Sequence, residues 1–226
     1  MTEKTRSDIV HVVDDNDGVR DLVVRALESV GVNCMAWDSP ETFLERAHEQ
    51  PVDLLVVDIR LVGMSGLELV RRARARSMAV PVIFISGIDE VSVAVDAMKL
   101  GAHDFLPKPF AAQVLIDSVQ AALRSGREQA GREASVAQAR AVLAKLSPRE
   151  RQVFLSVVDG KPNKVIAFDL GLSEKTVEEH RKHVMTKLAA SSVADLVKMA
   201  VLGGVCDPGG VSGGAVVSPS VCAAAK

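Results

Sequence analysis

Short apolar runs and amphipathic segments alternate along the first 123 residues. Runs with the length of β-strands lie at 9–13, 32–37, 54–58, 80–86 and 104–106. Segments with apolar residues at helical spacing lie at 18–30, 40–47, 66–77 and 90–100, and another begins at Phe110. Five strands that alternate with helices predict a parallel sheet with helices on both faces, an α/β, doubly wound, flavodoxin-like (βα)5 fold.

The pattern changes after residue 146, where no strand is predicted. Ser147 is a predicted N-cap, Pro148 suits the first helical position, and Glu150 completes a capping box. Short helices are predicted at 148–158, 164–170, 174–188 and 193–202, with Gly171 at the corner between the second and the third. This pattern predicts a small all-α helix-turn-helix domain.

The remaining segments join or follow these two domains. Residues 124–145 are rich in Ala, Gln, Glu and Arg, which favours a helical linker over a flexible one. It forms one helix or two, with Gly126 and Gly131 as the weak points. Residues 203–226 have no periodicity and are expected to be disordered. The predicted domains are therefore 1–123, a linker at 124–145, and 146–202.

Charge is distributed unevenly between these segments. Residues 1–123 carry 12 Lys and Arg against 19 Asp and Glu, a net charge of −7, whereas residues 146–202 carry 9 against 7, a net of +2. Drift of surface charge would explain this, and so would a cation-binding front half with a polyanion-binding back half. The polar start and the absence of a long apolar run indicate no membrane association and a cytoplasmic location.

Polar residues stand at the carboxyl ends of the predicted strands. They are Asp14 and Asp15 after the first strand, Asp58 at the end of the third, Ser86 at the end of the fourth, and Lys108 after the fifth. These ends share one sheet edge, so the side chains should converge. Three neighbouring carboxylates need a compensating charge, and Mg²⁺ prefers carboxylate, water and phosphate oxygens. The sequence predicts a magnesium-dependent phosphate site.

The same residues carry a resemblance to a known family. The motifs are Val12-Val13-Asp14-Asp15, Val57-Asp58-Ile59-Arg60, Phe84-Ile85-Ser86-Gly87 and Asp104-Phe105-Leu106-Pro107-Lys108-Pro109-Phe110. In this order and spacing they resemble the receiver domain of two-component response regulators, over residues 8 to about 123. The resemblance implies that Asp58 accepts a phosphoryl group from the phosphohistidine of a sensor histidine kinase.

Further roles follow from this resemblance. Asp15, Asp58 and the backbone carbonyl of Arg60 would bind Mg²⁺, and Asp14 would hold a metal-bound water. Lys108 and Ser86 would contact the phosphoryl oxygens, and Phe105 would turn inward when Ser86 moves. Lys108-Pro109 resembles the family's cis peptide. The family usually has proline four residues after the acceptor, whereas this chain has Val62, so we expect a less rigid loop there.

The back half resembles the LuxR-type helix-turn-helix. The motifs are Leu146-Ser147-Pro148-Arg149-Glu150, Asn163-Lys164-Val165-Ile166-Ala167 and Leu172-Ser173-Glu174-Lys175-Thr176-Val177. By position on the third helix, the candidates for reading bases are Glu178, Glu179, Arg181 and Lys182, and those for phosphate contacts are Lys175, Thr176, His183 and Lys187. Glu178 and Glu179 either read cytosine amino groups or are simply solvated.

Together the two resemblances indicate a response regulator of the NarL/FixJ class. They imply that phosphorylation of Asp58 promotes homodimerisation and binding to double-stranded promoter DNA, with RNA polymerase as a further candidate partner. The chain would not be an enzyme beyond its own phosphorylation and dephosphorylation. The alternatives are a magnesium-dependent phosphatase or phosphotransfer enzyme, weakened by the lack of a second acid at the third strand, and a phosphorylation-independent adaptor.

Overall fold

The computed structural model describes residues 8–87 and 91–206, and the chain divides into two compact units, Met1–Ala130 and Gly131–Lys226. The first unit contains a five-stranded parallel sheet in the order β2-β1-β3-β4-β5. Its strands are β1 (Ile9–Val13), β2 (Asn33–Trp37), β3 (Leu54–Asp58), β4 (Val82–Ser86) and β5 (Asp104–Pro107). Strand β3 is central and buried along its whole length, as its unbroken apolar run predicts.

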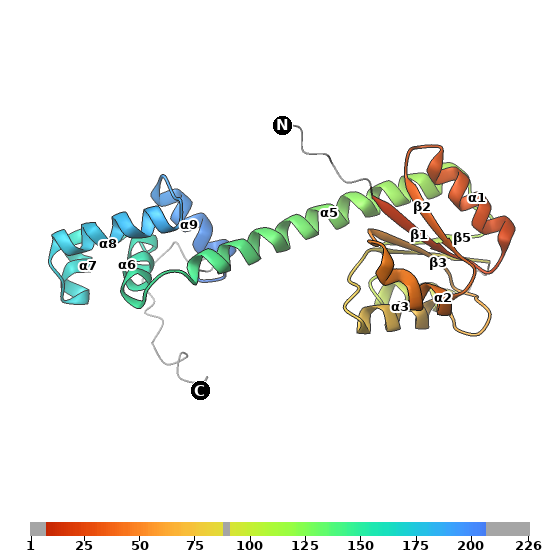
Figure 1. Ribbon diagram of the computed structural model, residues 1–226, viewed down its shortest axis with the longest axis horizontal. Coiled ribbons are helices and arrows are strands. Elements are labelled where there is room, and N and C mark those ends of the chain that lie inside the picture. The colour runs from red at the N-terminus through yellow and green to blue at the C-terminus, as the bar shows by residue number, and fades with distance from the viewer. Residues whose placement is uncertain (1–7, 88–90, 207–226) are drawn as a thin grey trace. The chain divides into compact units, whose positions relative to one another are not determined.

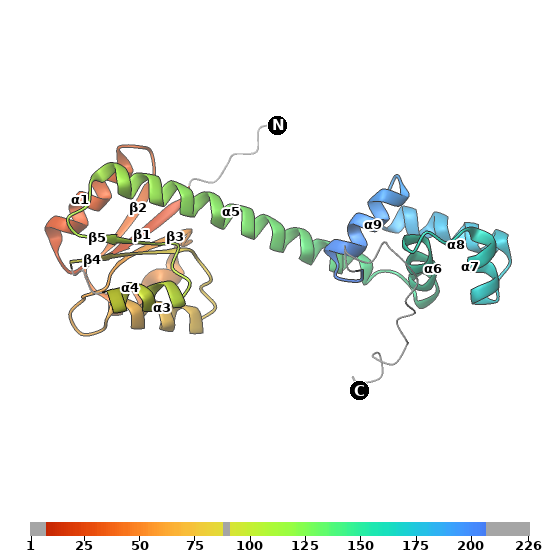
Figure 2. The ribbon, with the colours of Figure 1, turned by 180° about the vertical axis from the view of Figure 1, so that it is seen from behind.

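Helices cover both faces of this sheet (Figures 1 and 2). Helix α1 (Asp17–Glu28) and the first half of α5 (Ala112–Leu143) pack on one face through a core that includes Val23, Leu27 and Leu115. Helices α2 (Pro40–Arg46), α3 (Gly66–Ala75) and α4 (Val91–Lys99) pack on the other, together with the short 3₁₀ helix Ala47–Glu49. The predicted flavodoxin-like α/β architecture is confirmed.

Helix α5 is a single helix across the segment for which the sequence allows one helix or two. Gly126 is not a break in it: a Cβ there would approach Cγ of Pro81 to 3.2 Å, so the missing side chain lets α5 lie close to the loop before β4. One residue later, Arg127 pairs with Asp8 at 3.0 Å. The helix is therefore held to the first unit at least as far as residue 127.

The second unit contains four short helices around one apolar core. They are α6 (Pro148–Val158), α7 (Asn163–Leu170), α8 (Glu174–Lys187) and α9 (Val193–Leu202). Gly171 adopts φ +64° between α7 and α8, a left-handed conformation that glycine takes without strain. Capping boxes start α6, at Ser147 and Glu150, and α9, at Ser192 and Asp195. The predicted helix-turn-helix is present.

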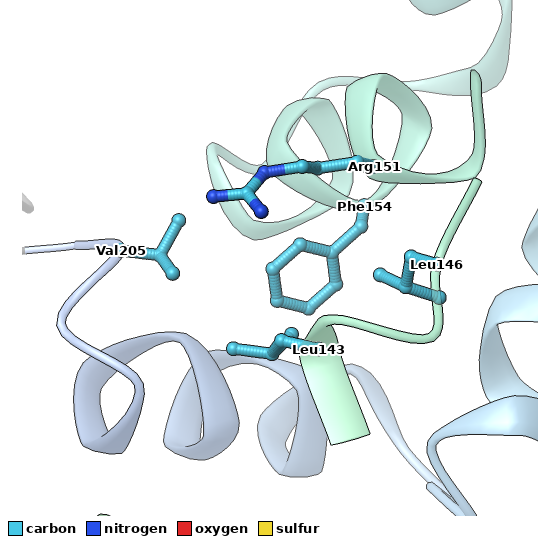
Figure 3. A pocket seen from close by; sticks show the side chains of 5 residues that line it. All are labelled: Leu143, Leu146, Arg151, Phe154 and Val205. Carbon is cyan, nitrogen blue, oxygen red and sulfur yellow. The ribbon is translucent and has the colours of Figure 1, made fainter. Parts of the chain in front are cut away.

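The core of the second unit also includes residues that precede and follow these helices. A pocket is lined by Leu143, Leu146, Arg151, Phe154 and Val205, and Figure 3 shows the other four side chains gathered around the Phe154 ring. Residues 203–206 were expected to be disordered, but they form a turn that packs Val205 and Cys206 against the core. The rest of the expected disordered tail, 207–226, lies outside the described residues. Among the described helices, none has the length and apolarity needed to cross a membrane.

Candidate functional site

The carboxyl edge of the sheet brings together three carboxylates and one ammonium group. Asp14 follows β1, Asp58 ends β3, and Lys108 follows β5. The Lys108 Nζ lies 2.8 Å from Oδ2 of Asp14 and 3.2 Å from Oδ2 of Asp58. Asp14, Asp15 and Asp58 each present an oxygen within 4.8 Å of the others. The convergence predicted from the strand ends is therefore present.

Asp58 lies in an environment that opposes its negative charge. Its side chain is 9% exposed, and burial raises the pKa of Asp58. Lys108 and the backbone N–H of Arg60 act in the opposite direction, whereas neighbouring Asp14 adds to the increase of the pKa. Oδ1 of Asp58 is buried and has no hydrogen-bond partner among the described residues. A buried carboxylate oxygen normally accepts a hydrogen bond, and no group in the described part of the chain donates one here.

The other two carboxylates are held by backbone groups. Oδ1 of Asp14, which is fully buried, accepts a hydrogen bond of 2.9 Å from the Asn16 N–H. Oδ2 of Asp15 accepts one of 3.0 Å from the N–H of Val62, in the loop after β3. This loop is also closed by a hydrogen bond from Gly66 N–H to the Ile59 carbonyl. The loop in which this chain has Val62 at the position of the family's usual proline therefore makes backbone hydrogen bonds of its own.

The remaining predicted receiver residues occupy the neighbouring strands. Ser86 ends β4, is 2% exposed, and accepts at its backbone carbonyl a 2.6 Å hydrogen bond from Lys108 N–H. Phe105, in β5, is partly buried against the core on the α3 and α4 face. The Lys108-Pro109 peptide bond is cis, as the resemblance implies. Arg60 is exposed in the loop after β3.

Gly66 allows α3 to start against the end of β3. A Cβ on Gly66 would lie 2.2 Å from the Asp58 carbonyl oxygen and 2.7 Å from Cγ1 of Val57, which no side chain tolerates without movement. From the sequence, Gly66 was predicted only as a helix boundary. The residue also sets the position of the Asp58 backbone. In the sequence, the only indication of this role is that Gly66 directly follows the Ser65 N-cap.

These residues fit a hard divalent cation. Carboxylate oxygens from Asp14, Asp15 and Asp58 are the ligands that Mg²⁺ prefers, and Oδ1 of Asp58 is an oxygen to which no described residue donates. The cluster has three carboxylates against the ammonium of Lys108. A cation would therefore reduce the repulsion that burial intensifies.

Helix α8 presents most of the predicted DNA contacts to solvent. Lys175, Glu178, Glu179, Lys182, His183 and Lys187 are exposed, whereas Val177 and Val184 are buried in the core of the unit. Thr176 is partly exposed, and its Oγ1 lies 2.8 Å from Oγ of the Ser173 N-cap. The helix therefore has one apolar side and one polar side, as its pattern predicts.

Two of the predicted contacts have partners within the protein. Arg181 donates to Oδ1 of Asn163, at the start of α7, over 2.8 Å. Lys187 lies 2.7 Å from Oε2 of Glu150, a buried carboxylate that also accepts a hydrogen bond from the Ser147 N–H. Both residues connect α8 to neighbouring helices. Sequence reasoning identified Glu150 only as a cap, and its pairing with a residue 37 positions away gave no local signal.

Comparisons with known proteins agree with both units. Residues 10–120 match the response regulator receiver domain, and residues 144–200 match the bacterial regulatory proteins of the luxR family. The transcriptional regulatory protein FixJ of Azorhizobium caulinodans is 44% identical over 196 residues, which are 87% of this chain and 93% of the relative. FixJ of Rhizobium meliloti is 43% identical over 207 residues, 90% of this chain and 98% of the relative.

A solved structure extends this likeness to the fold. The response regulator StyR aligns with a TM-score of 0.76 at 38% identity, covering 86% of this chain and 98% of that one. A receiver fold with three clustered carboxylates at one edge of its sheet, followed by a helix-turn-helix, defines a response regulator with a DNA-binding output. The chain belongs to the FixJ/NarL class of transcriptional response regulators. A histidine kinase and DNA are the partners that these two domains imply, and members of the class are not classical enzymes.

Proposed function

We propose that this protein regulates transcription through phosphorylation of Asp58 in a Mg²⁺-dependent reaction with a sensor histidine kinase. The observation that carries the proposal is the buried Oδ1 of Asp58, which has no partner among the described residues, beside Asp14, Asp15 and Lys108. An Oδ atom of Asp58 would attack phosphorus. The new P–O bond forms as the P–N bond to the kinase histidine breaks, and the electron pair of that bond returns to the histidine nitrogen.

Mg²⁺, when bound, would offset the negative charge of the incoming phosphoryl group. Oxygens of Asp15 and Asp58 and the backbone carbonyl of Arg60 would hold it, and Asp14 would hold one of its waters. Lys108 lies between Asp14 and Asp58 and has the length and charge to follow the phosphoryl oxygens. Ser86, at the end of the adjacent strand, would donate its hydroxyl to the same group.

The product is an acyl phosphate, which brings charge to an almost buried position. We propose that Ser86 moves toward it and that the partly buried Phe105 turns inward to occupy the space left behind. The switched surface, formed by α4, β5 and the start of α5, then pairs two copies of the protein. Exposed apolar residues on these helices support this assignment: Val95, Met98 and Val114 are 44%, 53% and 50% exposed.

Two paired helix-turn-helix units would bind two half-sites of promoter DNA, and contact with RNA polymerase would follow. Lys182 is exposed on α8 and makes no ion pair within the described part of the chain, so it is the strongest candidate for base contact. Lys175 and His183 are exposed candidates for phosphate contacts. Because Arg181 and Lys187 have internal partners, their contribution would be mainly to orient α8.

The test is a titration of labelled promoter DNA with and without a small phosphodonor and Mg²⁺. Wild-type protein should dimerise and bind more tightly with the donor, and Asp58→Asn should show neither response. A donor-dependent response that persisted in the Asn variant would contradict the role of Asp58. The matched control is Lys182→Ala, which should lose specific DNA binding and keep phosphorylation.

A further inference from the structure

The backbone of Val62 contacts the acidic site, although its side chain is directed to solvent. The side chain is part of an exposed loop, with the residue 79% exposed, and no predicted role depended on it. Its N–H, however, donates a 3.0 Å hydrogen bond to Oδ2 of Asp15, which lies 47 positions earlier in the chain. The contact joins the β3–α3 loop to a carboxylate of the candidate cation site.

We infer that the Val62 N–H is a positioning group for the cation site, an inference that rests on the proposed function. Asp15 is the most solvent-exposed of the three clustered carboxylates, so packing restricts it least. A carboxylate has two oxygens with about four lone-pair directions, so one N–H leaves acceptor capacity for a cation. Fixing Oδ2 lowers the entropy that Asp15 loses on binding the cation and aims its remaining lone pairs at the cluster.

An effect of the Val62 N–H in the opposite direction is also physically reasonable, and the direction of the change in Mg²⁺ affinity distinguishes the two. If the Val62 N–H instead competed with the cation for Oδ2, removing it would strengthen cation binding. The contacts of Asp14 favour orientation over competition. Asp14 also accepts a backbone hydrogen bond, from Asn16, while an oxygen of Asp14 remains within the 4.8 Å cluster. A backbone donor and membership of the cluster are therefore compatible on a neighbouring carboxylate.

Val62→Pro removes the N–H, and Val62→Ala keeps it while shortening the exposed side chain. We expect isothermal titration of the full-length protein with Mg²⁺ to give a dissociation constant about tenfold higher for Val62→Pro. Val62→Ala should remain within about twofold of wild type, because its donor is intact. Equal or tighter binding by Val62→Pro would overturn the inference, and so would an equal loss in Val62→Ala. A wild-type protein that did not bind Mg²⁺ would instead contradict the cation site itself.

Val62→Pro changes the rigidity of the loop as well as removing the N–H, so the second measurement leaves Val62 in place. In the metal-free protein, the Val62 amide proton should exchange slowly with solvent, and in Asp15→Ala its signal should shift upfield and exchange at least tenfold faster. An unchanged Val62 amide in Asp15→Ala would show that the Val62 N–H does not bond to Asp15, and the inference would fail. Circular dichroism of each variant establishes that the fold is retained.

Discussion

The buried carboxylate of Glu150 stabilises the second unit through two contacts to one of its oxygens. Its side chain is 6% exposed and lies 2.7 Å from Lys187 Nζ, and the Ser147 N–H donates to the same oxygen. The Lys187 ammonium and the Ser147 N–H hold the pKa of Glu150 at about 2, below its ordinary value of 4.5. At about 1.4 kcal/mol per pKa unit, this sets a ceiling of roughly 3 kcal/mol on the stabilisation.

Solvent screening reduces that ceiling, because Lys187 is 44% exposed. We expect Glu150→Gln, which keeps an acceptor for the cap, to lower the free energy of unfolding of the second unit by about 1 to 2 kcal/mol. Glu150→Ala should lose about 1 kcal/mol more, because the Ser147 N–H then has no acceptor. The effect should depend on pH: a lowered pKa stabilises the fold above about pH 4.5, and this stabilisation disappears as the pH falls toward 2.

The assay is urea unfolding of the full-length protein followed with two probes. The only tryptophan of the sequence, Trp37, lies in the first unit and reports its unfolding by fluorescence, while circular dichroism reports both units. The variants should shift the dichroism transition of the second unit and leave the Trp37 transition unchanged. Unchanged dichroism at pH 7, or a Trp37 transition that moved equally, would refute the reasoning. Lys187→Met is the reciprocal control and should destabilise the same unit.

Two further predictions concern the first unit. Gly66→Ala should lower its free energy of unfolding by about 1 to 3 kcal/mol and slow phosphorylation, because the new Cβ displaces the Asp58 backbone; normal phosphorylation kinetics would contradict this. His11 is buried between Trp37 Nε1–H and the Pro51 carbonyl, and burial lowers its pKa. Stability should therefore fall as the pH drops below about 6.5, because the unfolded chain takes up the proton first; a Trp37 fluorescence midpoint with the same pH dependence in His11→Gln would contradict this.

The sequence predicted the parts of the protein that local patterns encode. Apolar runs gave all five strands, and the polar residues at their ends gave Asp14, Asp58 and Lys108, because a parallel sheet places those ends along one edge. The helix spacing gave the core of the second unit, with Val177 and Val184 buried as expected. Strand and helix ends differed from prediction by a few residues at most, since termini depend on capping contacts.

The contacts that the sequence did not reveal are those made between distant segments. Every residue except proline has a backbone N–H, so the identity of residue 62 does not predict its hydrogen bond to Asp15. The Glu150 and Lys187 pair depends on how α6 and α8 pack, which spacing along one helix does not determine. Gly126 was read as a weak point because glycine has low helix propensity, but its role depends on the proximity of Pro81.

The unpartnered Oδ1 of Asp58 has a consequence for how the fold and its ligands are linked. A buried acceptor without a donor costs about 1 to 3 kcal/mol, so the native state is less stable than the same apolar sheet with a satisfied residue at this position. Any cation or phosphoryl group that engages the oxygen returns part of that energy. If Mg²⁺ and the phosphoryl group bind here as proposed, their occupancy would therefore raise the resistance of the receiver to heat and denaturant.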